Sequence, residues 1–299
     1  MMVEVNFLSD PAGRLKDHLY RLHGHASDGR GRRATSNRRS GWPRAPGDQK
    51  RVRILLMALL LGVVALSGCG AGLSSANHSK GVHMFVTMRS GVFGVTVDAG
   101  SLHLVSGPSG RVSLSGAVTY RGGRTPRISW EHTGNEVWLH SVCGSRDGDC
   151  RYDYTIFVPM SMTVFANDAA GDIWAKGLAG SLGVNAAAGN VTLAGISGPL
   201  HVTIGAGNVV AAGLRSATTD VEEGTGNVTL GFTAAPVDLT VRASTGNVSI
   251  VVPRSFSYRV STSDQLGEVS SGIADDPSSP RVISLSVGTG NVFVNQFSG

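Results

Sequence analysis

The chain has 299 residues, of which 41 are glycine and only 6% are aromatic, and its formal net charge is +5. The positive charge lies at one end, because residues 1–53 hold 12 of the 26 Lys and Arg but only 5 of the 21 Asp and Glu, which leaves the remainder with a net charge of −2. Nucleic-acid binding needs a basic surface on the folded part of a protein. The charge distribution therefore excludes nucleic acid as an expected partner.

The first segment, residues 1–53, has no apolar periodicity, and its stretch 29–46 (GRGRRATSNRRSGWPRAP) contains few apolar side chains. Such a composition cannot bury enough apolar surface to fold, so we expect a disordered basic segment. It also precedes an export signal, which normally begins a chain. We hypothesise that translation starts downstream, at Val52 or Met57; a twin-arginine export signal within the segment is the rival interpretation.

An uncharged run of 15 residues, 54–68 (ILLMALLLGVVALSG), follows this basic segment and leads into Cys69. A basic start, a short apolar core and small residues at the cut describe an export signal, and the run is short for a membrane-spanning helix. Residues 66–69, Leu-Ser-Gly-Cys, resemble the lipobox of bacterial lipoproteins. The resemblance implies lipidation of Cys69, cleavage before it, and anchoring at the outer face of the bacterial cell membrane. A plain transmembrane anchor is the alternative.

The small, polar residues that follow Cys69 predict a flexible tether over residues 69–81. Further along, Cys143 and Cys150 enclose a polar, glycine-containing stretch that is typical of a hairpin loop. A disulfide is expected there because disulfides persist outside the cytoplasm, and it stabilises the fold by about 2 to 3 kcal/mol in the chain-entropy model. Lipidation of Cys69 then accounts for the odd number of cysteines.

Residues 82–160 alternate between apolar and polar side chains without a steady repeat, and aromatic residues are concentrated there. Terminal units of repeat proteins are atypical because they close an exposed end of the core. We therefore expect residues 82–160 to form an irregular N-terminal β cap that the disulfide holds together. Within it, four aromatic side chains suggest a sugar-stacking patch, although alternation predicts that half of them pack into the cap: Trp130, His132, Trp138 and His140.

A Gly-Asn-Val tripeptide returns through residues 161–299 at steps that lengthen from 18 to 23 residues. Such self-similarity is the signature of a solenoid, and period-two alternation around each tripeptide predicts two short strands per unit. The prediction is an all-β fold, a narrow β-solenoid with roughly 18–23-residue coils; an antiparallel sandwich is the alternative. The repeat turns are Gly171-Asp172, Gly189-Asn190, Gly207-Asn208, Gly226-Asn227, Gly246-Asn247 and Gly290-Asn291, with Gly267-Glu268 as a variant.

The run from Tyr154 to Phe293, with the stretch 155–159 (TIFVP), Gly171-Asp172-Ile173 and the repeated Gly-Asn-Val motifs, resembles the bacterial putative adhesin domain family. The resemblance implies an exported β-solenoid with a role at the cell surface. It implies no catalytic residues, because the shared motif is a repeat signature.

The repeated Gly and Asn are interpreted as turn residues, because both tolerate left-handed backbone conformations, and not as a ligand-binding ladder. The acid pairs Asp147/Asp149 and Asp275/Asp276 supply too few oxygens for calcium, so no metal site and no cofactor are predicted. Neither a nucleophile elbow nor a metal-protease motif occurs.

The sequence thus predicts a non-catalytic lipoprotein of the cell surface, with an adhesin-like binding or structural module. The expected partners are the membrane, through the lipid anchor, and an envelope glycan or surface protein. Two alternatives remain open: a polysaccharide-active β-helix enzyme and a self-associating envelope scaffold.

Overall fold

The computed structural model describes residues 3–6, 77–122, 126–144 and 150–297. Within these ranges the chain forms strands and turns and no helix, which confirms the all-β prediction. The predicted export signal, Cys69 and the Asp147/Asp149 pair lie outside the described residues.

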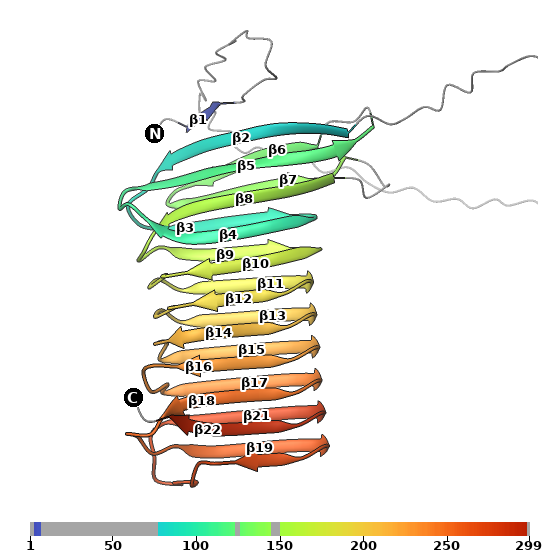
Figure 1. The fold of residues 1–299 in the computed structure, drawn as a ribbon. Helices are drawn as coiled ribbons and strands as arrows, with labels where there is room; N and C mark the ends of the chain where they lie inside the picture. The colour runs from blue at the N-terminus through green and yellow to red at the C-terminus, as the bar shows by residue number, and fades with distance from the viewer. Residues whose placement is uncertain (1–2, 7–76, 123–125, 145–149, 298–299) are drawn as a thin grey trace, which may run out of the picture. The chain divides into compact units, whose positions relative to one another are not determined.

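Two sheets face each other across an apolar core (Figure 1). We name the sheet of twelve strands sheet A and the sheet of ten strands sheet B. The strands of sheet A, in spatial order, are β1 (Val3–Asn6), β2 (Asn77–Thr87), β5 (Arg111–Arg121), β8 (Cys150–Pro159), β4 (Gly100–Gly107), β10 (Gly171–Lys176), β12 (Val191–Ala194), β14 (Val209–Leu214), β16 (Val228–Phe232), β18 (Val248–Pro253), β22 (Val292–Phe297) and β20 (Val269–Ser271). Those of sheet B are β19 (Arg259–Leu266), β21 (Val282–Thr289), β17 (Asp238–Thr245), β15 (Thr218–Thr225), β13 (Leu200–Ala206), β11 (Leu182–Ala188), β9 (Thr163–Asp168), β3 (Val92–Val97), β7 (Glu136–Val142) and β6 (Arg127–Thr133).

Each coil of the solenoid is one strand of sheet B followed by one strand of sheet A. Successive coils pair in parallel and in register, so that Val184 lies beside Val202 and Val191 beside Val209. The alternating side chains of each strand point into the core or out to solvent. The inward alanines Ala186 and Ala211 are buried, as expected for sheets that lie close together.

The coils do not stack in chain order at either end. The coil β19–β20 lies outermost, and β21–β22 is inserted between it and β17–β18. At the other end β3–β4 lies between β7–β8 and β9–β10. The sequence interpretation assumed successive coils, and it is wrong at these two places. The polar inner face of β19, with Thr262 and Asp264, suits an end position, whereas the apolar inner face of β21 needs a neighbour on both sides.

The cap also differs in detail from its prediction. Strands β2, β5 and β8 pair antiparallel, as do β6 and β7, but β3, β4, β7 and β8 are already coils of the solenoid. The disulfide Cys143–Cys150 is present, and it joins the end of β7 in sheet B to the start of β8 in sheet A. The two cysteines therefore link strands of different sheets, where a hairpin loop had been expected.

Two segments expected to lack structure contain strands. The predicted tether ends early, because β2 begins at Asn77. Residues 3–6, in the segment expected to be disordered, form β1 and pair antiparallel with residues 83–86 of β2. The outer edge of β2 offers unpaired backbone groups, which an extended segment can satisfy.

Candidate functional site

A ladder of side-chain hydrogen bonds runs along the corner where each strand of sheet B passes into sheet A. At each step the backbone N–H and the Nδ2 group of one asparagine donate to Oδ1 of the residue one coil earlier, at 2.8–3.2 Å. The ladder ends where the backbone N–H of Glu268 donates to Oδ1 of Asn291. Its members, in spatial order, are Asp172, Asn190, Asn208, Asn227, Asn247 and Asn291.

The direction of the ladder explains why its first member is an aspartate. Every asparagine donates toward the N-terminal end and accepts from the next coil, so only the first position needs no donor. A carboxylate accepts but does not donate, and Asp172 fills that position. From the sequence these asparagines were expected only to form turns, and the hydrogen bonds between asparagines of adjacent coils were not predicted.

The glycine of each pair is required by backbone geometry. Gly226 has a φ of +155°, and a Cβ there would lie 1.6 Å from the carbonyl oxygen of Gly207 in the preceding coil. The other ladder glycines share this positive φ and this close approach. A side chain at this corner would force neighbouring coils apart, so the Gly-Asn pair maintains the stacking.

Beside the ladder, the outward face of sheet A contains a hollow of about 650 Å³. Asn190 and Asn208 line one side of it, and Trp174, Thr192 and Val210 line its floor. The ring of Trp174 lies 5.7 Å from that of His103 at an angle of 41°. The hollow combines amides with an aromatic and an aliphatic surface, which suits a ligand that is partly polar and partly apolar.

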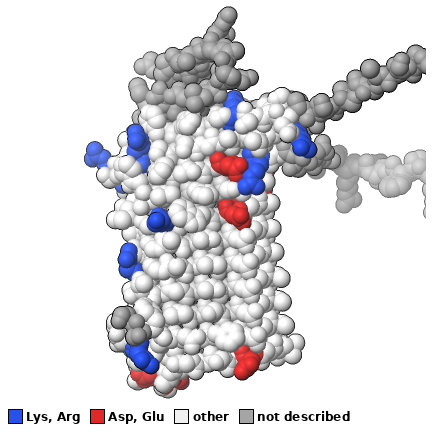
Figure 2. All heavy atoms as spheres, in the orientation of Figure 1, with Lys and Arg blue, Asp and Glu red and all other residues white. Residues whose placement is uncertain are grey.

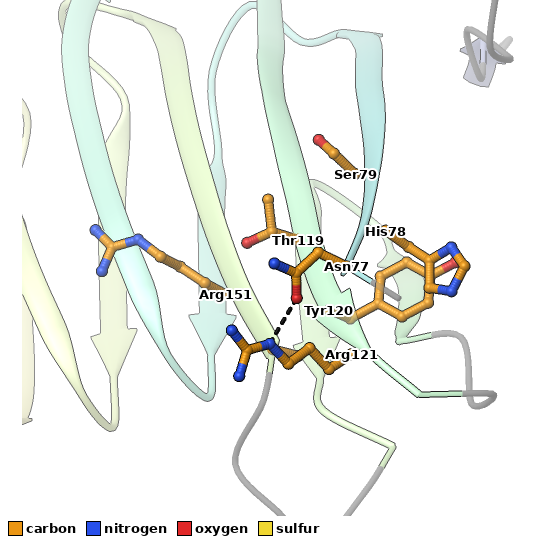
Figure 3. A pocket seen from close by; sticks show the side chains of 8 residues that line it. Asn77, His78, Ser79, Thr119, Tyr120, Arg121 and Arg151 are labelled. Carbon is orange, nitrogen blue, oxygen red and sulfur yellow. Dashed lines mark hydrogen bonds between the residues drawn. The ribbon is translucent and has the colours of Figure 1, made fainter. Parts of the chain in front are cut away.

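A second depression, of about 400 Å³, lies where β2, β5 and β8 run side by side (Figure 3). His78 stacks on Tyr120 with ring centres 5.1 Å apart, and Nε of Arg121 donates to Asn77. Arg151 lines it too, but its guanidinium bonds Asp153 at 2.9 Å. Both arginines that line this depression are thus already paired with a neighbouring side chain.

The outward face of sheet B contains an ion cluster that the sequence analysis did not identify. Arg242 lies 3.3 Å from Asp220 and 3.4 Å from Glu222, and His201 lies 3.4 Å from Asp220. These residues come from three neighbouring strands, β13, β15 and β17. An alignment of the repeats by their Gly-Asn pairs would have placed these four residues at neighbouring positions of adjacent strands.

Trp138, His140 and Phe165 are also on the outward face of sheet B. The ring of Trp138 lies 6.0 Å from that of Phe165 and 6.4 Å from that of His140, and both pairs are nearly parallel. Trp130, in contrast, packs against the core from β6, whereas His132 on the same strand is exposed. The four aromatic residues singled out in the sequence are thus divided between the two faces.

Two acidic side chains of the described residues are almost fully buried in the core. Asp168 and Glu223 are both 3% exposed, and burial raises the pKa of Asp168 to about 6 and that of Glu223 to about 7. Asp168 accepts the backbone N–H of Ala170, but neither oxygen of Glu223 has a hydrogen-bond partner among the described residues. They lie inside the coil stack, where no polysaccharide can reach them.

The remaining acid pair, Asp275 and Asp276, organises a loop. Asp275 accepts the backbone N–H of Val260 at 2.8 Å, and Asp276 accepts from the backbone and hydroxyl of Ser278. No group of three His, Cys, Asp or Glu side chains suited to a metal ion occurs in the described ranges. The same part of the chain contains no helix long and apolar enough to span a membrane.

The face of the solenoid in Figure 2 has few charged side chains, and these are scattered. Neither a basic stripe nor a dense acidic patch crosses this face. Its surface between the two ends consists mainly of uncharged groups.

Comparison with known proteins identifies the repeat region. Residues 147–283 match the family model described as Toastrack DUF4097. This segment runs from β8 to the start of β21 and contains most of the Gly-Asn corners. The repeat region is thus similar to a Toastrack domain, and its two-sheet solenoid agrees with the β-solenoid fold that the family resemblance implied.

No curated protein matches the sequence. Among solved structures, a putative cell adhesion protein from Clostridium sporogenes is 11% identical, with a TM-score of 0.32, and the match covers 74% of this chain and 100% of that one. A putative adhesin from Bacteroides fragilis is 15% identical, with a TM-score of 0.32 and coverage of 73% and 97%. A putative lipid binding protein from Parabacteroides distasonis is 10% identical, with a TM-score of 0.30 and coverage of 75% and 98%.

Proposed function

We propose that this protein is a lipid-anchored module of the bacterial cell surface whose solenoid binds an envelope or extracellular partner without catalysis. The observation that carries the proposal is the in-register stacking of the coils. It repeats each outward position from strand to strand and so aligns side chains in rows across both sheets. Rows of this kind suit contact with an extended partner more than chemistry at a single bond.

The arrangement of the carboxylates supports binding over catalysis. A glycoside hydrolase places two carboxyl groups on either side of the scissile bond. Here Asp168 and Glu223 are buried, and the exposed Asp220 and Glu222 are engaged by Arg242. The hollow beside Trp174 is lined by amides, a hydroxyl and apolar groups, with Asp172 as its one carboxylate.

Anchoring rests on the Leu-Ser-Gly-Cys sequence at residues 66–69. Two or more acyl chains on one cysteine hold a protein stably on a membrane, whereas a single chain is marginal. Cys69→Ser should abolish incorporation of a labelled fatty acid and release the protein from the membrane fraction. The double variant Cys143→Ser/Cys150→Ser is the control and should keep the label. Retention of the label by the Cys69→Ser protein would refute the lipoprotein assignment.

Binding is tested with the full-length protein on arrays of glycans and of purified envelope proteins. The proposal predicts saturable binding to at least one of these classes. The proposed binding function would be contradicted if the protein bound neither glycans nor envelope proteins, both on the arrays and on the envelope of the cell that produces it.

A further inference from the structure

We propose that the outward face of sheet B binds a neutral polysaccharide, with sugar rings stacked on Trp138 and Phe165. The inference rests on the proposed binding function and names the ligand class and its place. It concerns the strip formed by Trp138, His140 and Phe165, which we call the aromatic strip, and a neighbouring row of polar residues.

The rings of the aromatic strip share one orientation. The planes of Trp138 and Phe165 differ by 11°, and those of Trp138 and His140 by 14°. Trp138 is half-buried between the inward residues Val137 and Leu139, and Phe165 is 40% exposed. The rings lie on the outward face of the sheet, so packing in the core does not explain them. Their nearly parallel planes give this surface one common orientation.

Glycines make room for both rings. Gly94 on β3 lies in register between Trp138 and Phe165, and a Cβ there would lie 2.0 Å from an atom of the Trp138 ring. Gly183 on β11 follows in the same row, and a Cβ there would lie 2.6 Å from the Phe165 ring. Each ring therefore leans across the neighbouring strand at a position without a side chain. This leaves a low apolar surface that an extended ligand can approach.

Two residues further along the strands than Trp138 and Phe165, at the register of His140, lies a row of neutral hydrogen-bonding side chains. The row crosses β3, β9, β11 and β13 in register. Its members, which we call the polar row, are Thr96, Asn167, Asn185 and Thr203. Hydroxyl and amide groups both donate and accept, which matches the hydroxyl groups of a sugar.

The spacing fits a polymer. Adjacent strands lie about 4.8 Å apart, which is close to the advance of one pyranose ring in an extended polysaccharide. A chain lying across the strands would therefore meet one polar side chain per strand while its apolar ring faces contact the aromatic strip. This dual chemistry, apolar faces with hydroxyl edges, distinguishes a sugar from a lipid or an apolar peptide.

Charge at the borders disfavours an acidic polymer. Glu131 on β6 pairs in register with Trp138 and so lies at one end of the aromatic strip. At the other end Asp220 and Glu222 follow β13, although Arg242 pairs with both. No Lys or Arg occurs in the aromatic strip or the polar row, so neither supplies a charged partner for a carboxylate or sulfate group.

The test measures binding of the full-length protein to hydroxyethyl cellulose, mannan and soluble chitin oligosaccharides, with alginate as the anionic comparison. The inference predicts that wild type binds at least one neutral polysaccharide more tightly than alginate. The double variant Trp138→Ala/Phe165→Ala should weaken that binding at least tenfold. The matched control Phe293→Ala removes an aromatic ring that is 39% exposed on the opposite sheet, and it should leave the affinity unchanged.

A second variant, Asn167→Ala/Asn185→Ala, removes amides from the polar row without touching the rings, and it should also weaken binding. It serves as the test if the ring variant does not fold, as judged from its melting transition. Unchanged affinity in a folded variant of the strip, loss of affinity in the Phe293→Ala control, or preference for alginate would overturn the inference. If wild type binds only envelope proteins, the inference fails while the proposed binding function stands; if it binds nothing, both fail.

Discussion

At the scale of single residues, the Gly-Asn pair determines how one coil meets the next. Glycine allows the close approach of backbones, and asparagine extends a hydrogen bond to each neighbour. The sequence predicted the place of the pair because the period is visible. The ladder was not predicted because asparagine is common in turns for local reasons, and the mutual bonds depend on a register that only stacking creates.

The ladder has a direction, and a pair of substitutions tests it. Asp172→Asn should change the free energy of unfolding by less than about 0.5 kcal/mol, because the new amide still accepts from Asn190 through its oxygen. Asn227→Asp should cost about 2 kcal/mol at neutral pH, since a carboxylate oxygen would replace the donor that faces Oδ1 of Asn208. Denaturant unfolding measures both. Equal costs for the two changes would contradict a directional ladder.

The corner glycine should be less replaceable than a turn glycine. Gly226→Ala places a Cβ against the carbonyl oxygen of Gly207, and we expect a loss of more than about 3 kcal/mol. Gly195 also has a positive φ, +62°, but no atom lies within 4 Å of an added Cβ, so Gly195→Ala should cost only about 1 to 2 kcal/mol. Thermal melting of the two variants should separate them clearly. A similar loss of stability in both would show that backbone approach is not what selects glycine.

The buried Glu223 should make stability depend on pH. Burial raises its pKa to about 7 in the folded state, above its ordinary value of 4.5 in the unfolded chain. Below pH 4.5 the carboxyl is neutral in both states. Between about pH 4.5 and 7 it ionises in the unfolded chain but stays protonated in the folded one, which favours the unfolded state increasingly up to about pH 7. Stability should therefore fall over this window by about 3 kcal/mol. Glu223→Gln should remove this part of the pH dependence and be more stable at pH 8.

The neighbouring Glu222 provides the control for that measurement. It is exposed and paired with Arg242 on the outer face, so Glu222→Gln should change stability by less than about 1 kcal/mol. A Glu223→Gln protein that kept the full pH dependence would show that another group, such as Asp168, is responsible.

At the scale of strands and coils, the two ends depart from chain order. The strands themselves were predictable, because alternation and the Gly-Asn period mark both strands of each coil. Their order at the ends was not, because it depends on which coil can leave its inner face uncovered. Thr262 and Asp264 on β19 indicate an end coil only once their inward orientation is known, and β19 comes before β21 in the chain.

Cross-linking tests the order of the last three coils. Thr245 pairs with Thr289 in the adjacent strand, whereas Leu266 lies one strand further out. Strands lie about 4.8 Å apart, and a disulfide needs Cα atoms closer than about 7 Å. Thr245→Cys/Thr289→Cys should therefore form a disulfide, and Thr245→Cys/Leu266→Cys should not. Coils stacked in chain order would give the reverse result, which mass spectrometry of the oxidised proteins would reveal.

The aromatic strip could be predicted only in part from the sequence, because its members come together through the register of the strands. Trp138 and His140 were visible as aromatic residues on one predicted strand. Phe165 was not associated with them, because it joins them only through β3, which pairs with both β7 and β9. The glycines beneath the rings, Gly94 and Gly183, gain meaning only from this register.

At the scale of the whole molecule, the end coil bears on self-association. Strands β19 and β20 each have one neighbour, and Leu266 on β19 is 70% exposed. Against this, Asp264 points inward at the end of the core, where one of its oxygens is buried without a hydrogen-bond partner in the described structure. An inward charge on an edge strand is a known defence against further strand addition. The inward charge of the end coil thus disfavours the addition of a strand from a second copy at this edge.

We expect this solenoid to bind a neutral polysaccharide and to leave its glycosidic bonds intact. The most direct measurement is the chain-length distribution of a neutral polysaccharide recovered from the protein-bound fraction after long incubation. We expect a populated bound fraction whose chain lengths equal those of the untreated polymer. Shortened chains with new reducing ends would contradict the non-catalytic assignment, and an empty bound fraction would contradict the proposed ligand class.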